Sequence, residues 1–286
     1  MDDRSTAAPP EAVEIKPADE VQERIEAEER SSPSGAIVYK AILKEGEEEL
    51  DRNSAALFWS GVAAGLAMGF SMFTQAFIIS HLPDAEWTPL VSALGYSTGY
   101  LIVILGRQQL FTENTLTPIL PLLQRKQGAT IGNVLRMWII VLVANLIGAV
   151  AIALVAAHTT AFEADVREAI VGLGEKAMSL EWGTVVLRGV FAGWLIALIV
   201  WLLPFAESAR LWVIVIVTYI VGIGEFTHVI AGSIDVYAYA AMGHTSWGEA
   251  FVGYTVPAFI GNVIGGLALV TALNHGQVTA GKENVG

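Results

Sequence analysis

"GRQQLFTENTLTP", residues 106–118, is a polar stretch inside otherwise apolar sequence. Residues 89–105 before it, "PLVSALGYSTGYLIVIL", have the composition of a membrane-spanning segment, and residues 119–123, "ILPLL", are apolar again. Pro118 and Pro121 prevent one continuous helix through the region. In a bilayer, backbone outside a helix is tolerated only where protein buries it or where it lines a cavity. We therefore expect this stretch to line a protein interior, namely a pore.

The composition of the 286-residue chain is that of a membrane protein. Hydrophobic residues make up 54% of it, charged residues 15%, and the mean hydropathy is +0.56. The absence of cysteine excludes disulfides, cysteine-ligated zinc and thiol catalysis. Segments of about 20 apolar residues predict helices that cross a bilayer. The sequence predicts six spans, of which the second and fifth are interrupted: 55–80, 89–122, 134–157, 183–203, 211–242 and 251–273.

The net charge of -12 is concentrated near the beginning of the chain, where acids alternate with bases. This region has no apolar segment of the signal-peptide kind. We expect an acidic disordered tail over 1–34, a charged cytoplasmic helix over 35–54, a pore domain over 55–273 and a cytoplasmic tail over 274–286. A solvated tail is the favoured interpretation of the first region, and a partner-binding arm is the alternative.

The charges of the loops predict the orientation, because short cytoplasmic loops collect Lys and Arg. The loop after the second span contains Arg125, Lys126 and Arg136, whereas "HLPDAEWTP" and "GHTSWGE" contain neither Lys nor Arg. We place the first loop inside and the other two outside, together with the long loop 158–182. Six spans then put both termini in the cytoplasm.

The two halves of the chain share three short motifs in the same order, at the first, second and third span of each half. The matches are "GVAAGLA" (61–67) with "GVFAGWL" (189–195), "LFTEN" (110–114) with "EFTHV" (225–229), and "NLIGAVAIAL" (145–154) with "NVIGGLALV" (262–270). An odd number of spans per copy predicts two inverted three-helix repeats, an architecture of transporters and channels. Small residues in these motifs let helices approach closely, and we assign helix packing to Gly61, Gly65, Gly189, Gly193, Gly261 and Gly265.

The second interruption, "GIGEFTHVIAGS" (222–233), contains His228, the one histidine of five that lies inside a predicted span. Ionisable groups in spans are costly and are functional candidates by default. We expect a neutral ring at rest that takes a proton when an anion arrives, which would make it a proton partner for a weak acid. A histidine that only donates to a backbone carbonyl is the alternative. Thr112, at the matching place in the other repeat, offers a hydroxyl that donates or accepts.

Five motifs together resemble the formate/nitrite transporter family over roughly residues 55–273: "GYLIVILGRQQLFTENT", "RMWIIVLVANLIGA", "RGVFAGWLIALIVWL", "EFTHVIAG" and "PAFIGNVIGG". The resemblance implies an all-α membrane protein with an aquaporin-like fold, six transmembrane helices in two inverted three-helix repeats and broken second and fifth helices. It further implies a homopentamer in the bacterial inner membrane with one pore per protomer and a small-anion substrate. No enzyme activity, cofactor, metal or nucleic acid is implied.

The resemblance also implies roles for individual residues. Thr112 and His228 would be the central pore pair, and Lys176 would correspond to a basic residue that draws anions into the outer vestibule. The pore constrictions would be formed by Leu110, Phe111 and Phe226. The remaining pore-lining or vestibule candidates are Gln109, Glu113, Asn114, Thr227, Arg107 and Glu225.

This chain departs from the family pattern beside both interruptions. Gln109 stands where the family has an acid and Glu113 where it has a glycine. Thr227 replaces the acid before the histidine, Gly232 replaces an asparagine four residues after it, and Gly193 replaces an asparagine in the fourth span. These changes bear on the solute more than on the fold. Arg107, Glu113 and Glu225 are additional charges, which either pair with one another or line the vestibules.

The leading hypothesis is a channel or transporter for small monovalent anions such as formate or nitrite, or for their conjugate acids, with protonation at His228. A water or glycerol channel is disfavoured because the chain has no "NPA" triplet. An intramembrane hydrolase could use Ser233 with His228, but neither G-x-S-x-G nor H-E-x-x-H is present. A family-like protein whose altered pore carries another small solute, or which has a structural or regulatory role, is left open.

Overall fold

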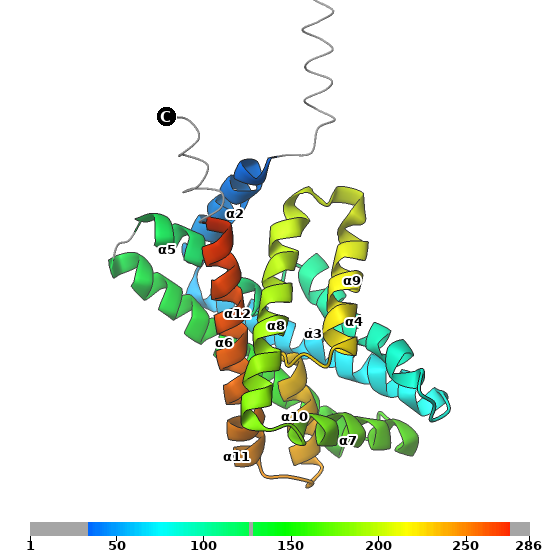
Figure 1. The fold of residues 1–286 in the computed structure, drawn as a ribbon. Coiled ribbons are helices and arrows are strands. Elements are labelled where there is room, and N and C mark those ends of the chain that lie inside the picture. Colours follow the sequence, from blue (N-terminus) through cyan, green and yellow to red (C-terminus); the bar gives the residue numbers. More distant parts are fainter. Residues whose placement is uncertain (1–33, 126–127, 275–286) are drawn as a thin grey trace, which may run out of the picture. The chain divides into compact units, whose positions relative to one another are not determined.

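The computed structural model describes residues 34–125 and 128–274, and these residues form helices and no strands (Figure 1). Residues 1–33 of the tail predicted over 1–34, and residues 275–286 of the tail predicted over 274–286, lie outside the described residues. The longer helices are α2 (Gly35–Leu50), α3 (Ser54–His81), α4 (Thr88–Leu105), α6 (Gly128–His158), α7 (Ala164–Met178), α8 (Trp182–Leu202), α9 (Arg210–Ile223), α10 (Ala231–Ala241) and α12 (Val256–Asn274). Shorter elements are α5 (Ile119–Arg125), α11 (Trp247–Ala250), a π-helical turn (Phe251–Thr255) and 3-10 turns at Glu113–Thr115, Leu203–Phe205 and Glu207–Ala209.

Five helical segments in the described part of the chain are long and apolar enough to cross a bilayer. They are Ser54–His81, Thr88–Leu105, Gly128–His158, Trp182–Phe205 and Trp247–Leu273. The predicted fifth span is not among these segments. It consists of two short helices, α9 with 14 residues and α10 with 11, which are separated by an irregular link. The predicted second span is also broken, since α4 ends at Leu105 and α5 begins at Ile119. The region 158–182, expected to be a loop, contains the amphipathic helix α7.

Glycines on α3 and α8 permit two close helix contacts. A Cβ on Gly65 would lie 2.2 Å from the carbonyl oxygen of Asn145 on α6, and a Cβ on Gly193 would lie 2.2 Å from that of Asn262 on α12. The other glycines assigned to packing face the same two contacts: Gly61 on the α3–α6 contact, and Gly189, Gly261 and Gly265 on the α8–α12 contact. Such close approach allows many favourable van der Waals contacts where lipid supplies no hydrophobic driving force.

The two ends of the helix bundle carry different helices. Figure 1 shows α2 and α5 at one end, and α7 and α11 at the other. α2 packs on α5 and α8, whereas α7 packs on α10 and α3. We call these ends the α2 side and the α7 side.

Candidate transport pathway

Asn145 on α6 fixes the first irregular link, residues 106–112. Its Oδ1 accepts from the backbone N–H of Phe111 at 2.9 Å, and its Nδ2 donates to the carbonyl oxygens of Gly61 at 2.7 Å and Gln109 at 2.8 Å. The side chain is fully buried. Because unpaired backbone groups are costly in a dry interior, this amide makes the non-helical backbone tolerable there.

Asn262 on α12 fixes the second link, residues 224–230, by the same contacts. Its Oδ1 accepts from the N–H of Val229 at 2.8 Å, and its Nδ2 donates to the carbonyl oxygens of Gly189 and Thr227, each at 2.9 Å. The backbones also correspond: Arg107 and Glu225, which follow the helix-ending glycines of α4 and α9, have φ values of 49° and 50°. The two links are therefore built alike.

Thr112 and His228, which we call the central pair, are brought together by these links. Thr112 Oγ1 lies 2.7 Å from His228 Nε2, and both side chains are fully buried. The ring of Tyr100 packs edge-on against the imidazole, with centroids 5.2 Å apart. The contacts that the described residues make with this pair are all uncharged, so an ion at this point would lose its hydration without gaining a counter-ion.

Hydrogen bonds hold His228 in one neutral tautomer. Its Nδ1 accepts from the backbone N–H groups of Ile230 at 3.2 Å and Ala231 at 3.1 Å, at the start of α10. Since an accepting nitrogen carries no hydrogen, the proton of the neutral ring is on Nε2, which donates to Thr112. The Thr112 hydroxyl is then left with its own hydrogen, for which the described residues provide no acceptor. It can donate that hydrogen to a solute.

The α2-side cavity, of about 670 Å³, is lined by Gln109, Glu113 and Asn114, which lie within three residues of Thr112. Gln109 donates to Glu49 Oε2 of α2 at 2.9 Å and accepts from Asn114 Nδ2 at 2.9 Å. Arg52 pairs with the same glutamate at 3.0 Å. These contacts connect α2 to the first link.

Glu113 and Arg107, two of the additional charges, both line the α2-side cavity. Oε1 of Glu113 is buried and has no hydrogen-bond partner. In the described residues neither side chain forms an ion pair, although the cavity is also lined by other charged groups, including Glu45. Partial desolvation, followed by the neighbouring Glu49 carboxylate, raises the pKa of the Glu45 carboxyl.

The α7-side cavity, of about 110 Å³, is lined by Phe226, Thr227 and Gly232, which flank His228. Glu225, the third additional charge, lies here and pairs with Lys176 at 2.6 Å and with Arg188 at 3.0 Å. The alternative that Arg107, Glu113 and Glu225 pair with one another is therefore wrong, because Glu225 pairs with Lys176 and Arg188, and neither Arg107 nor Glu113 forms an ion pair in the described residues. Thr227 does not face the cavity as a free hydroxyl, since it donates to the carbonyl oxygen of Val185 at 2.6 Å.

The three apolar candidates for constrictions occupy different environments. Leu110 and Phe111 are fully buried, and Phe111 packs against Trp138 and Phe259. Neither lines a described cavity. Phe226 lines the α7-side cavity and stacks on Phe191, with ring centroids 5.2 Å apart.

Residues next to Thr112 line one of these cavities and residues next to His228 line the other, whereas Thr112 and His228 themselves line neither. A sequence profile described as "Formate/nitrite transporter" matches residues 36–276, which is most of the chain. The chain belongs to the formate/nitrite transporter family. It is therefore an integral membrane transport protein from a family of channels and transporters, and not an enzyme, as the resemblance implied.

Known proteins resemble this transporter along most of their length. The inner membrane protein YfdC of Escherichia coli (strain K12) is 34% identical over 275 residues, which cover 95% of this chain and 89% of YfdC. The formate channel BtFdhC of Bacillus thuringiensis is 24% identical over 242 residues, which cover 82% of this chain and 91% of the channel. A solved pentameric formate channel with formate bound shares the fold, with a TM-score of 0.62 at 17% identity over 77% of this chain and 95% of that channel.

The hydrolase alternative has no catalytic pair in this transporter. Ser233 bonds to the carbonyl oxygen of Val229 and to Thr255 Oγ1, the latter at 2.8 Å. Both ring nitrogens of His228 are occupied by Thr112 and by the backbone of α10. Among the described residues, no serine is therefore positioned for activation by this histidine.

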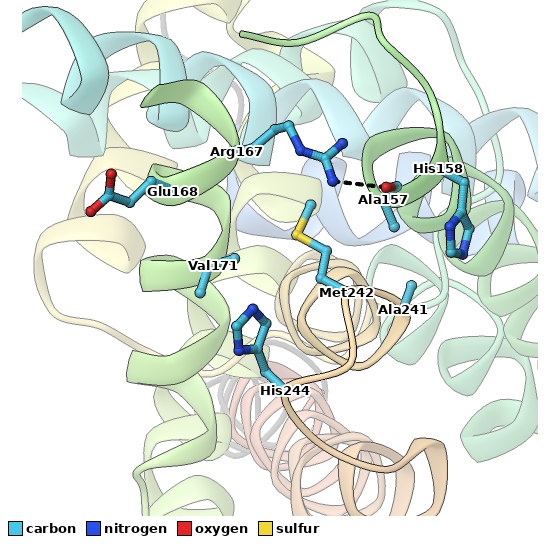
Figure 2. A pocket seen from close by; sticks show the side chains of 8 residues that line it. All are labelled: Ala157, His158, Arg167, Glu168, Val171, Ala241, Met242 and His244. Carbon is cyan, nitrogen blue, oxygen red and sulfur yellow. Dashed lines mark hydrogen bonds between the residues drawn. The ribbon is translucent and has the colours of Figure 1, made fainter. Parts of the chain in front are cut away.

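A separate cavity of about 380 Å³ lies on the α7 side and is not part of this pathway. It is lined by the end of α6, by α7 and by the end of α10, and Figure 2 shows His158 and His244 on different sides of it. Arg167 donates to the carbonyl oxygens of Ala156 and Ala157 at 3.0 and 2.9 Å. Arg167 therefore satisfies the last carbonyls of α6.

Several residues near the central pair were not identified from the sequence. Asn145 and Asn262 could have been found, because each begins the third matched motif of its half and is a polar residue in an apolar span. Arg188, which precedes the "GVFAGWL" motif, carried a weaker signal. Tyr100 and Tyr254 carried none, since aromatic residues are common in membrane helices and their proximity to His228 depends on the fold.

Proposed function

We propose that this protein conducts small monovalent anions of the formate and nitrite type across the bacterial inner membrane, and that they pass the central pair as neutral conjugate acids. Family membership and the formate channels among its relatives support the solute class. The observation that carries the second part is the buried, uncharged central pair between two cavities. An unpaired ion in such surroundings costs many kcal/mol, whereas a neutral acid does not.

The central pair acts as a hydrogen-bond relay in this proposal. His228 Nε2–H donates to Thr112 Oγ1, which orients the threonine hydroxyl so that its hydrogen points away from the ring. That hydrogen is donated to an oxygen of the passing solute. Thr112 thus replaces part of the hydration that the solute loses between the cavities.

The proton that neutralises the anion is taken up on the same path. Transfer from His228 requires an imidazolium, and Nδ1 can accept a proton only by giving up the N–H groups of Ile230 and Ala231. Protonation at His228 therefore stays a prediction, and its cost is the loss of these two hydrogen bonds to Nδ1. The alternative within this proposal is that the proton enters together with the anion.

We also propose the larger assembly that the sequence predicts. The equivalent contacts of Asn145 and Asn262 support two inverted three-helix repeats, in which α9 and α10 together form the fifth of six crossings. The likeness to a pentameric formate channel supports a homopentamer. The loop charges support an α2 side, and both termini, in the cytoplasm.

Uptake by proteoliposomes tests this function. We would measure entry of labelled formate, nitrite, acetate and lactate for the wild type, Thr112→Val and the control Thr271→Val, whose threonine is exposed on α12 and bonds only to its own helix. Thr112→Val should slow uptake about tenfold, because one hydrogen bond contributes roughly 1–1.5 kcal/mol. Equal rates in all three proteins would contradict the role of the central pair. No uptake by a correctly assembled wild type would contradict the proposed solute class.

A further inference from the structure

The α7-side cavity contains a carboxylate that is held by cations from two different helices. Lys176 Nζ on α7 lies 2.6 Å from Glu225 Oε1, and Arg188 Nη1 on α8 lies 3.0 Å from Oε2. Arg188 Nη1 is also 3.4 Å from the backbone oxygen of Glu225. Each carboxylate oxygen thus has its own cation, which is how proteins commonly bind a carboxylate ligand.

The position of this cluster makes it accessible before the central pair. All three side chains line the α7-side cavity together with Thr227, the residue before His228. Their exposed fractions are 55% for Lys176, 31% for Arg188 and 42% for Glu225. A solute that enters from the α7 side therefore meets these two cations before it reaches the central pair.

Glu225 occupies both cations of this cavity. The basic lining residues are Lys176 and Arg188, the acidic ones are Glu225 and Asp235, and the other titratable lining groups are the phenols of Tyr96 and Tyr254. While Glu225 stays in place, a free anion finds no cation here that lacks a carboxylate partner. Asp235 makes no ion pair among the described residues, so Glu225 is the carboxylate that occupies the cations.

The family resemblance implies that Lys176 draws anions into this vestibule. We propose that Arg188 completes with it an entry site for small carboxylates and other planar monovalent oxyanions, and that Glu225 is a tethered competitor for this site. The inference rests on the proposed function and deepens it. A solute carboxylate displaces the Glu225 side chain, takes its place between the two cations and then moves on past Thr227. Because a short tether corresponds to an effective concentration on the order of millimolar, Glu225 keeps the solute out of the entry site at low external concentrations.

The test compares variants of the full-length protein in lipid nanodiscs and in proteoliposomes. Binding of ¹³C-formate would be followed by NMR saturation transfer, and the concentration dependence of labelled formate uptake would give an apparent KM. The variants are Glu225→Gln, Lys176→Gln and Arg188→Gln. Glu175→Gln is the matched control, because this exposed glutamate lies next to Lys176 and lines none of the described cavities.

Glu225→Gln should lower both the Kd and the apparent KM for formate roughly three- to tenfold, which is within the combined range of its two partly exposed ion pairs. Lys176→Gln and Arg188→Gln should raise both values, and Glu175→Gln should change neither. Unchanged or weaker formate binding in an assembled Glu225→Gln variant would overturn the inference, even if uptake that depends on Thr112 persisted. If formate bound more tightly to Glu225→Gln but no variant transported it, the entry site would stand and the proposed function would fail.

Discussion

Gly232 leaves room for the Tyr254 side chain beside His228. A Cβ at position 232 would lie 1.8 Å from the Tyr254 hydroxyl oxygen and 2.4 Å from Cζ, so any side chain there would collide with the ring. Tyr254 belongs to the π-helical turn Phe251–Thr255, and such turns shift the register of a helix and often occur at functional sites. The asparagine that the family resemblance implies at this position is thus replaced by a phenol that comes from another helix.

The fit between these two positions is testable by a double-mutant cycle. Gly232→Ala should destabilise the protein by about 1–3 kcal/mol, because it overpacks a buried contact. Tyr254→Val leaves a cavity and destabilises the protein on its own, but the loss in the double variant should be smaller than the sum of the two single losses, since the shorter side chain vacates the space. Thermal unfolding of the detergent-purified protein measures both effects. Additive losses in the double variant would show that the two positions do not compete for this space.

The irregular links depend on one asparagine each. Without Asn262, the N–H of Val229 and the carbonyl oxygen of Thr227 would lose their partner, and without Asn145 the same would happen at Phe111 and Gln109. A buried polar group left unpaired costs about 1–3 kcal/mol. The equivalent contacts predict that the two substitutions have similar effects.

We therefore expect Asn145→Ala and Asn262→Ala each to lower stability by about 2–6 kcal/mol, since each orphans two backbone groups. The measurement is the thermal midpoint of the purified protein. Asn133→Ala, on the exposed face of α6, is the control and should leave the midpoint in place. A midpoint that moves no more in Asn262→Ala than in the control would contradict the role of this amide.

α2 is attached to the first link through Gln109 and Glu49. A hydrogen bond to a charged group contributes about 1.5–3 kcal/mol, so Gln109→Leu should accelerate amide exchange over Gly35–Leu50 by roughly tenfold or more. Glu48→Ala, which removes only an exposed pair with Lys44 within α2, should not. Equal exchange rates in wild type and Gln109→Leu would show that the link does not hold α2.

Both broken spans were predictable from the sequence, because prolines, glycines and polar residues interrupt apolar segments at matching positions of the two halves. The pairing of Thr112 with His228 followed from the same match and from the family resemblance. The partners of Glu225 did not follow, since Lys176 and Arg188 lie 49 and 37 residues away and are brought to it only by the packing of α7 and α8. α7 was missed because its short amphipathic pattern is weak beside the apolar spans. The register of Tyr254 depends on a π turn that periodicity does not reveal.

At the scale of the whole molecule, large apolar side chains cover the outside of the described helices. Trp59 is 68% exposed, Trp212 64% and Ile139 63%. Lipid or other copies of the chain must cover such surfaces, because they are unfavourable in water. The proposed homopentamer predicts a native mass five times that of the 30.5 kDa chain when the protein is released from mild detergent in a mass spectrometer. A single-chain mass under conditions that preserve membrane oligomers would contradict the assembly.

The central claim is that the solute is neutral where it passes Thr112 and His228. It is tested most directly by separating the electrical from the proton driving force in proteoliposomes. A potassium gradient with valinomycin would impose a membrane potential of either sign, and a buffer gradient would impose a pH difference. Labelled formate and lumenal pH would be recorded together, and the flux through protein-free liposomes would be subtracted.

The account predicts formate uptake that follows the pH gradient, is indifferent to the membrane potential and acidifies the lumen by one proton per formate. His228→Gln, which keeps a hydrogen-bond donor near Thr112 but cannot be protonated, should retain this coupling if the proton enters with the anion, and lose it if His228 supplies the proton. Uptake that follows the membrane potential without lumenal acidification would contradict neutral passage and mean that the anion itself crosses between the two cavities.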